Sequence, residues 1–382
     1  MILYCGLMSG TSLDGIDTAF AEIEVLDASP NAPRFAVRFA ASGFTPYPNA
    51  LKARLQPLRH GEAVSIAEVC ALHYELAELY AEAVVKTALE NGIALSDIAG
   101  VGLHGQTVWH APPSSSTATS STLQLGQPAV LAERLGIPIV SDFRARDIAA
   151  GGEGAPLVPF ADYALLASPS ETRVMLNLGG VANVTYLEAG GDLDQIIAFD
   201  TGPGNLVIDG AARALLGTEC DSNGAIAAQG TINSGLLAEL LTLPYFALAP
   251  PKSTGAELFD NRYIADFLAR AASLAPEETL ATATELTVRT IVGALQNFLP
   301  RLPQRIIVGG GGARNQTLLR GLQTALPTII FDTHEAHGIP SDAKEALAFA
   351  LLACATLHHI PANVPSATGA RGRRVLGSVT YP

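Results

Sequence analysis

The stretch ILYCGLMSGTSLDGIDTAFAEIEV, residues 2–25, decides the fold of this 382-residue chain. Apolar and β-branched residues flank a polar turn with glycines at positions 10 and 15, which predicts a strand, a Gly-rich turn and a second strand. Such a turn exposes successive backbone N–H groups, and its glycines let a phosphate approach them closely. The stretch has no basic n-region, so we interpret it as a first strand rather than a signal peptide.

The same pattern recurs in the second half of the chain. TRVMLNLGGVANVTYLEAG (172–190) again predicts strand, Gly-rich turn and strand, and IIAFDTGPGN (196–205) predicts a strand that ends in a polar glycine turn. RIIVGGGGARNQTLLRGL (305–322) predicts strand, glycine run and helix. Gly-turn hairpins that open both halves indicate an internal duplication. We therefore expect an α/β protein with two lobes and a cleft between them.

Two helices are predicted in the first and last parts of the chain. Residues 66–91 carry apolar side chains at helical spacing, and Gly92 follows as a C-cap. The apolar face is expected to comprise Ile66, Val69, Leu72, Leu76 and Leu79. DAKEALAFALLACATLHH (342–359) is the last strong helix, and the low-complexity segment 112–122 is expected to be a solvated loop.

Composition excludes several classes of protein. With 36 acidic and 23 basic residues the net charge is -13, which disfavours nucleic acid and membrane surfaces as partners. None of the four lysines lies in a Walker-type loop, which excludes the P-loop route to ATP. The absence of an 18-residue apolar run predicts no transmembrane helix. Cys5, Cys70, Cys220 and Cys354 are far apart in the sequence, which favours reduced core thiols and a cytoplasmic location.

The first turn is a candidate phosphate site. Ser9, Thr11 and Ser12 add hydroxyl donors without charge, and Asp14 or Asp17 could hold Mg²⁺ directly or through water. An ordinary polar hairpin tip is the alternative for this motif. A serine-nucleophile elbow is excluded, because Gly6-Leu7-Met8-Ser9-Gly10 does not have the G-x-S-x-G spacing.

FDTGPGN (199–205) supplies the candidate catalytic carboxylate. An Asp at the end of a strand, before a Gly-rich turn, points to the crevice where α/β folds bind ligands, and a sugar kinase needs a general base there. Asp200 is that candidate, and Gly202 and Gly204 are expected to turn their amides toward phosphates. The alternative is that Asp200 only forms an Asx-turn before Pro203.

VGGGGARN (308–315) is the third glycine turn, where bare backbone at Gly310 and Gly311 would let adenosine lie flat. A Rossmann dinucleotide site is the competing interpretation, since Asp332 falls near the required spacing. The late position of the motif counts against it. Three Gly-rich turns at strand ends over two similar halves are the arrangement by which the actin/hexokinase/Hsp70 superfold holds ATP.

The motif set resembles that of anhydro-N-acetylmuramic acid kinases over essentially the whole chain. The matching segments are GLMSGTSLDGID (6–17), HGQT (104–107), SDFRARDIAAGGEGAPLVP (141–159), LNLGGVANVT (176–185), FDTGPGN (199–205), PPKSTG (250–255), VGGGGARN (308–315) and DAKEALAFALLA (342–353). The resemblance implies a two-lobed, actin-like (ribonuclease H-like) duplication with an interdomain cleft. It also implies an enzyme of peptidoglycan recycling that uses ATP and Mg²⁺ to convert 1,6-anhydro-N-acetylmuramic acid and water into N-acetylmuramic acid 6-phosphate.

The resemblance also implies roles for particular residues. Asp200 is the expected base, and His104, Arg144 and Glu345 are expected at the sugar. The ATP phosphates would lie on the first turn, from Ser9 through Gly10, Thr11, Ser12, Leu13, Asp14, Gly15 and Ile16 to Asp17, with Asp14 as the Mg²⁺ contact. A structural salt bridge to Asp142 or Asp147 is an equally weighted alternative for Arg144. The family often has Arg after PKSTG, whereas this chain has Ala256.

The anhydro bridge explains why water is needed. O6 is tied to C1, so the base has no hydroxyl proton to remove and must activate a water that attacks C1. A kinase that acts on a free sugar hydroxyl and an actin-like nucleotide switch are the rival hypotheses. The expected lobes are residues 1–138 with 345–382, and residues 139–344; whether the chain acts alone or as a homodimer is left open.

Several residues are expected to be structural rather than functional. His334 and His337 form an H-x-x-H pattern and His358 and His359 a pair, but metal binding would need further ligands at suitable spacing. Trp109 is expected to anchor the core or a loop.

Overall fold

A computed structural model describes residues 1–115, 119–254 and 258–382, which form two compact units. Unit 1 comprises Met1–Leu166, Asp192–Asp194 and Gly338–Pro382, and unit 2 comprises Ala167–Gly191 and Gln195–His337. The sequence placed residues 139–166 in the second lobe. They lie in unit 1 because strand β7 (Ile139–Ser141) pairs there with two strands of the unit 1 sheet.

Unit 1 is built on a six-stranded mixed sheet in the order β13-β7-β4-β1-β2-β3. The first three strands are antiparallel, β1 to β4 and β4 to β7 are parallel pairs, and β13 returns antiparallel to β7. The remaining bounds are β1 (Ile2–Met8), β2 (Gly15–Asp27), β3 (Arg34–Pro46), β4 (Ile98–Leu103) and β13 (Ser378–Thr380). A separate hairpin, β5 (Gln106–Ala111) with β6 (Ser121–Leu125), follows β4 directly.

Unit 2 repeats this topology. Its five-stranded sheet has the order β10-β9-β8-β11-β12, again three antiparallel strands followed by two parallel ones. The strands are β8 (Arg173–Leu178), β9 (Val181–Leu187), β10 (Ile197–Pro203), β11 (Arg305–Gly309) and β12 (Ile330–Thr333). In each unit the third, second, first, fourth and fifth strands are neighbours in that order. The predicted duplication of a ribonuclease H-like sheet is therefore confirmed.

Helices cover both faces of the unit 1 sheet, because successive side chains of a strand point to opposite faces and both sets are apolar or small. Cys5 and Leu7 of β1 join the core cluster formed with α2 (Ile66–Glu90) and α3 (Pro128–Leu135), while Gly6 faces α11 (Lys344–Leu357). The remaining helices of the unit are α1 (Asn49–Arg59), α4 (Phe143–Ala149), α5 (Val158–Leu166) and α12 (Pro365–Thr368).

Helix α11 lies so close to the sheet that two strand positions must be glycine. A Cβ at Gly6 would stand 1.8 Å from the carbonyl oxygen of Ala346, and one at Gly102 would stand 2.0 Å from that of Phe349. The backbone of the helix therefore contacts the backbone of β1 and β4 directly. This packing fixes the first turn of α11, which carries Glu345, close to β1.

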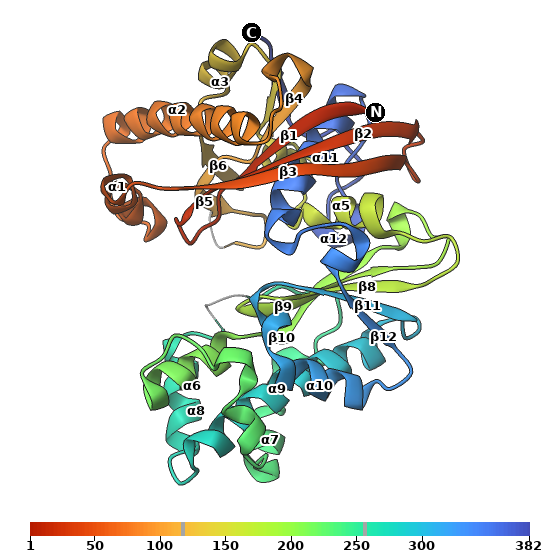
Figure 1. Cartoon of the computed structure of the whole chain (residues 1–382). Helices are drawn as coiled ribbons and strands as arrows, with labels where there is room; N and C mark the ends of the chain where they lie inside the picture. The colour runs from red at the N-terminus through yellow and green to blue at the C-terminus, as the bar shows by residue number, and fades with distance from the viewer. Residues whose placement is uncertain (116–118, 255–257) are drawn as a thin grey trace. The chain divides into compact units, whose positions relative to one another are not determined.

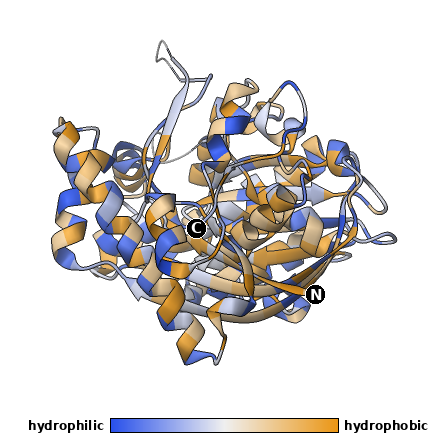
Figure 2. Cartoon of the chain, turned by 90° about the horizontal axis from the view of Figure 1, so that it is seen from above, coloured by the Kyte–Doolittle hydropathy of each residue, from blue (hydrophilic) through white to orange (hydrophobic). Residues whose placement is uncertain are grey.

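In unit 2 the helices form two clusters. α9 (Pro276–Phe298) and α10 (Gln316–Ala325) cover one face of the sheet. α6 (Leu206–Leu216), α7 (Ser234–Leu240) and α8 (Asn261–Arg270) pack with α9 in a helical subcluster. In Figure 2 hydrophobic and hydrophilic residues alternate along most helices, which is typical of one buried and one exposed face.

Some sequence expectations are corrected by burial. Ile66, the first residue of α2, is 83% exposed, whereas Leu72 and Leu76 are fully buried. Cys70 and Cys220 are exposed, so only Cys5 and Cys354 are core thiols. The expected loop 112–122 ends earlier than predicted, since β6 begins at Ser121.

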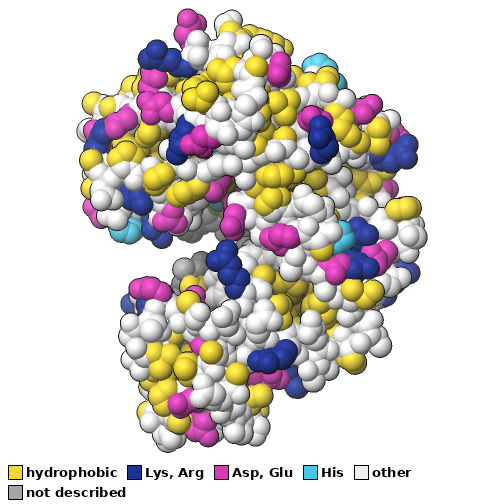
Figure 3. All heavy atoms as spheres, viewed as in Figure 1, with side chains coloured by type: hydrophobic (Ala, Val, Ile, Leu, Met, Phe, Trp, Pro, Cys, Tyr) yellow, Lys and Arg dark blue, Asp and Glu magenta, His cyan; other side chains and the backbone are white. Residues whose placement is uncertain are grey.

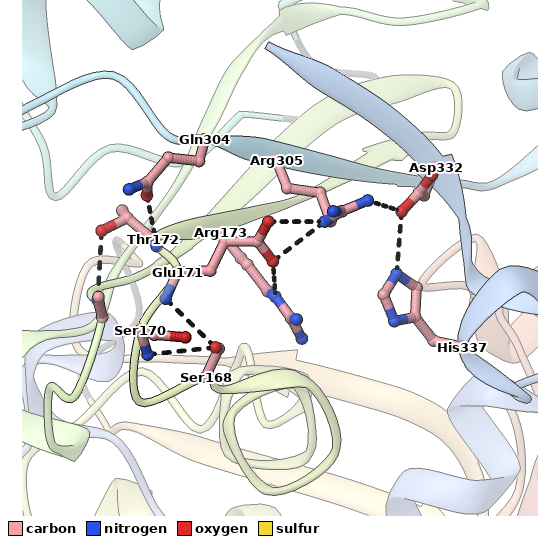
Figure 4. A network of polar contacts seen from close by, with 10 residues as sticks. Ser168, Ser170, Glu171, Thr172, Arg173, Gln304, Arg305, Asp332 and His337 are labelled. Carbon is pink, nitrogen blue, oxygen red and sulfur yellow. Dashed lines mark hydrogen bonds and ion pairs between the residues drawn. The ribbon is translucent and has the colours of Figure 1, made fainter.

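An ion-pair network ties the edge of the unit 2 sheet together (Figure 4). Arg305 lies between Glu171, at 3.0 Å, and Asp332, and His337 reaches Asp332 at 3.4 Å. Asp332 is therefore engaged by Arg305, which weakens the Rossmann interpretation. On the face shown in Figure 3, acidic and basic side chains are interspersed. Among the described residues, no helix is both long and apolar enough to cross a membrane.

Candidate functional site

The turn between β1 and β2 presents backbone N–H groups to solvent. Thr11 and Ser12 are exposed, and within the described part of the chain their amides have no protein acceptor. Leu13 anchors the turn, since its side chain is buried in the core and its N–H donates to the Gly10 carbonyl at 3.3 Å. These amides are therefore available to an anion such as a phosphate.

Not every predicted residue of this turn can contact a ligand through its side chain. Ser9 is 1% exposed and its hydroxyl hydrogen-bonds to the hydroxyl of Tyr80 on α2, so it supports the turn from behind. Leu13 and Ile16 belong to the core, and Gly15 starts β2, where a Cβ would meet the carbonyl oxygen of Thr45 at 2.3 Å. The predicted hydroxyl contacts are thus reduced to Thr11 and Ser12.

Carboxylates gather on one side of the turn. Burial, followed by the charges of Glu345, Asp342 and Asp14, raises the pKa of Asp17 to about 6. Asp14 is exposed. Among the described residues no group of three or more His, Cys, Asp or Glu side chains could hold a metal ion. A Mg²⁺ ion here would therefore need oxygen ligands from nucleotide phosphates and water, which suits this cation.

The buried His104 and the half-buried Arg144 form a pair at the ends of β4 and β7. Arg144 directs Nε and Nη2 to Nε2 of His104 at 3.1 and 2.9 Å, and Nη1 donates to the Gly154 carbonyl at 2.9 Å. Burial lowers the pKa of Arg144 to about 10, while the charge of Glu345 opposes this change. Burial, with the Arg144 charge as the next cause, places the pKa of His104 well below its usual value.

The predicted salt-bridge alternative for Arg144 is not seen among the described residues. Asp147, one of the expected partners, is fully buried and accepts hydrogen bonds from the Gly154 amide at 2.9 Å, Asn363 at 2.8 Å and Thr368 at 2.9 Å. Asp147 therefore holds the loop whose Gly154 carbonyl contacts Arg144. No local sequence pattern indicates this supporting role.

A cavity of about 290 Å³ opens beside His104 within unit 1. It lies at the carboxyl ends of the parallel strands β4 and β7, the edge where α/β sheets bind ligands. Its polar lining comprises His73, His104, Gln124, Gln127, Ser141 and Asp142. Several hydrogen-bonding groups around a space of this size are suited to a small polar molecule such as a sugar.

Asp200 lies in unit 2 at a bulge in β10, where the register against β9 shifts between Asp200 and Gly202. Bulges next to active sites redirect a side chain out of the ladder. The Asp200 carboxylate accepts hydrogen bonds from the Thr254 amide at 2.8 Å and the Ser253 hydroxyl at 3.1 Å. Both donors belong to the PPKSTG segment, so two sequence motifs far apart along the chain meet at this carboxylate.

Lys252, in the same segment, is held by aromatic rings and by a backbone hydrogen bond to Asp200. Its ammonium group lies 4.6 Å from the ring centre of Phe298 and 4.9 Å from that of Tyr245, and its carbonyl accepts the Asp200 amide at 3.2 Å. Burial lowers the pKa of Lys252, and the charge of Asp200 opposes that change. Residue Ala256, the departure from the family pattern, lies outside the described residues.

The glycine turn after Asp200 differs from its predicted role. The Gly204 amide donates to the Gly180 carbonyl at 2.8 Å, so it is not free for a phosphate. A Cβ at Gly204 would stand 2.3 Å from the Gly179 carbonyl, which explains the glycine by close backbone approach. Thr287 of α9 donates to the Gly204 carbonyl at 2.8 Å, a contact that sequence reasoning missed because α9 was not assigned.

The glycine run after β11 has one open position. A Cβ at Gly310, whose φ is 79°, would clash with Asn177 at 2.6 Å, whereas Gly311 has no atom within 4 Å of a Cβ. Gly311 is exposed and begins the short turn η6 (Gly311–Arg314). Bare backbone open to solvent at this point is compatible with a flat ligand.

The histidines and tryptophan set aside earlier have structural contacts. His334 is buried beneath Gly309, and His358 hydrogen-bonds to Tyr4 at 3.2 Å. Trp109 is 48% exposed on the β5–β6 hairpin and donates to Ser121 at 3.1 Å, so it anchors a hairpin rather than the core.

Comparison with known proteins adds to this geometry. The sequence profile described as anhydro-N-acetylmuramic acid kinase matches residues 2–382. A protein of that name from Gloeobacter violaceus is 46% identical over 378 residues, covering 99% of this chain and 98% of its own length. Those from Salinibacter ruber and Caldanaerobacter subterraneus are 44% and 40% identical, each covering 99% of this chain and 96% of its own length.

Proposed function

Because the chain belongs to the anhydro-N-acetylmuramic acid kinase family, we propose that it opens 1,6-anhydro-N-acetylmuramic acid with water and phosphorylates O6 from ATP. The products would be N-acetylmuramic acid 6-phosphate and ADP, in the recycling of peptidoglycan. We place this reaction in the cytoplasm, where ATP is available. The observation that carries the proposal is the Asp200 carboxylate at the β10 bulge, held by Ser253 and Thr254.

Asp200 is the proposed general base. Water attacks C1 of the anhydro sugar, Asp200 takes the proton from this water, and the C1–O6 bond breaks. O6 then receives the γ-phosphoryl group, so no free hydroxyl is required. Two hydrogen bonds to one carboxylate oxygen fix the orientation of the side chain, which a base needs before the transition state.

The turn between β1 and β2 is the proposed phosphate site. Its exposed amides at Thr11 and Ser12 can donate to phosphate oxygens without the cost of reorganisation. Mg²⁺, when bound with the nucleotide, would neutralise charge that develops on the transferred group. Asp14, the exposed carboxylate of the turn, is the residue we propose to contact this ion through water.

Arg144 is the proposed partner of the lactyl carboxylate. A guanidinium can grip a carboxylate with two hydrogen bonds, and in a partly buried setting such a pair is strong. Glu345, whose charge acts on Arg144, is the proposed partner of sugar hydroxyls. The cavity beside His104 is lined by neither of these two residues and is assigned no ligand. Adenosine is assigned to the open backbone at Gly311.

Two measurements on the purified protein test this function. ADP release should depend on 1,6-anhydro-N-acetylmuramic acid, and turnover in ¹⁸O-water should place label at C1 of the product. Turnover without label at C1 would instead indicate a kinase for free hydroxyl groups. Equal ATP hydrolysis with and without sugar would contradict both and favour a nucleotide switch.

A further inference from the structure

We propose that the turn His104–Gly105–Gln106 positions the phosphate turn and the sugar-binding arginine together, and so couples nucleotide affinity to sugar affinity. Gln106 acts on the phosphate turn and His104 on Arg144. This inference rests on the proposed function. It assigns roles to Gln106 and to Tyr47 and Tyr80 behind it, and it makes His104 a positioning residue rather than a substrate contact.

Gln106 links the turn to the phosphate site. The side chain is fully buried, and its amide nitrogen donates to the Gly10 carbonyl at 3.2 Å and to the Thr107 carbonyl at 3.3 Å. In a trans peptide the C=O and the following N–H lie in one plane and point in opposite directions, so the direction of the Gly10 carbonyl sets that of the Thr11 N–H. Gln106 therefore fixes the direction in which the phosphate turn presents its first amide.

A chain of buried hydroxyl groups holds Gln106 in place. Tyr47 donates to its amide oxygen at 3.2 Å, and the Tyr47 and Tyr80 hydroxyls are 3.4 Å apart. The Tyr80 hydroxyl in turn contacts the hydroxyl of Ser9, at the start of the phosphate turn. All four side chains are at most 3% exposed, so the network is closed to water and specifies one arrangement.

His104 holds Arg144 through one acceptor. An arginine can only donate, so Nε2 of His104 must be unprotonated to accept from both Nε and Nη2 of Arg144. The imidazole is 4% exposed and lies against Phe349, with ring centres 4.8 Å apart. The guanidinium is thereby oriented, and its charge is not neutralised by a carboxylate at this contact.

The backbone between these two residues is clamped. The His104 amide donates to the Leu7 carbonyl of β1 at 3.0 Å, and a Cβ at Gly105, whose φ is 77°, would stand 2.8 Å from the Leu125 carbonyl. The turn therefore cannot move without shifting β1 or the β5–β6 hairpin. One rigid turn with a contact to each binding element is a physical connection by which occupancy of one can bias the other.

Paired variants separate the two arms. Gln106→Met keeps the shape but removes both donors, so we expect the Kd for ATP in the absence of sugar to rise about tenfold. Its KM for the sugar, at saturating ATP, should change less than about twofold. His104→Met should raise the KM for the sugar and leave the Kd for ATP nearly unchanged. His104→Gln, which can place an oxygen near the Nε2 position, should bring the KM for the sugar back close to the native value.

A matched control measures the effect of lost stability alone. Thr356 is buried in α11 and donates to the Leu352 and Leu376 carbonyls at 2.8 and 2.6 Å, with no contact to the turn in the described structure. Thr356→Val should lower the Tm while it leaves both KM values unchanged. If Gln106→Met changed only the Tm, as this control does, the positioning role would be refuted.

The coupling itself is measured by calorimetry with the non-hydrolysable analogue AMPPNP, with and without the sugar. We expect the sugar to tighten AMPPNP binding at least about fivefold in the native protein and less than twofold in either Met variant. Unchanged coupling in both variants would overturn the inference. If the native protein did not turn over the sugar, the proposed function would be overturned. The AMPPNP affinity of Gln106→Met would still test whether Gln106 positions the phosphate turn.

Discussion

Substitution of Asp200 by asparagine separates the role of this carboxylate in catalysis from its role in the fold. Asn keeps an oxygen that can accept from the Thr254 amide and the Ser253 hydroxyl, at present 2.8 and 3.1 Å away. Both bonds lose their charge assistance, which costs about 1 kcal/mol each or less. The unfolding free energy should therefore fall by at most about 2 kcal/mol.

The catalytic loss should be larger. Asn cannot take a proton from water, and a positioned general base contributes about 10² to 10⁴ in rate. We expect kcat to fall by about 10³, which is about 4 kcal/mol of transition-state stabilisation. The KM for ATP should change less than about threefold, because a base that acts on the attacking water contributes in the transition state and not to nucleotide binding.

The assay is ADP release at saturating ATP and anhydro sugar, with thermal unfolding measured on the same samples. Asp260→Asn is the matched control, since Asp260 also lies in unit 2 and accepts two backbone N–H groups, each at 2.9 Å, at the start of α8. Asn is an equally good N-cap, so this variant should keep its kcat. A kcat for Asp200→Asn within about tenfold of the native value would refute the assignment of the base.

Three further predictions concern stability, each measured as the midpoint of thermal or denaturant unfolding. Gly102→Ala should lower the free energy of unfolding by about 3 kcal/mol or more, because its Cβ would overlap the backbone of α11. Gly293→Ala within α9, where a Cβ meets nothing within 4 Å, should raise it by about 0.5–1 kcal/mol, and equal effects of the two variants would contradict the packing. Asp17→Asn should raise the Tm near about pH 8 but not near about pH 4. The pKa of Asp17 in the folded protein, about 6, lies above the ordinary value of 3.8, so the ionised carboxylate destabilises the fold above pH 6 and this penalty disappears as the pH falls toward 3.8. A Tm difference that does not depend on pH would contradict this reasoning. Asp147→Ala should cost about 2–4 kcal/mol, since three buried donors lose their acceptor, while Glu219→Ala, at a side chain that is 94% exposed, should cost less than about 0.5 kcal/mol.

The α/β class and the duplication could be predicted from the sequence alone. Local chemistry decides whether a glycine turn joins two strands, and such turns at 9–14 and 179–180 are visible without any contact information. The helix at 66–90 was also predicted from its period, except that Ile66 proved exposed. What failed was the long Thr-rich helix α9, where buried threonines donate to their own helix and hide the apolar period.

Pairings between distant segments were decided only by the tertiary structure. Ser253 and Thr254 meet Asp200 across more than fifty residues of chain, and Gln106 meets Gly10 across nearly a hundred. No local pattern encodes which buried donor will face which acceptor, because that choice depends on the register of strands and on the depth at which helices pack. The same packing showed that the Gly204 amide is already used and that Arg144 faces an imidazole rather than a carboxylate.

The sequence by itself thus determined the type and order of the elements and named the residues with chemistry to offer, since turn geometry and hydrophobic period are local properties. The tertiary structure decided which of these residues present free groups and which support others. That distinction depends on burial and on hydrogen-bond partners, and both are properties of the packed chain as a whole.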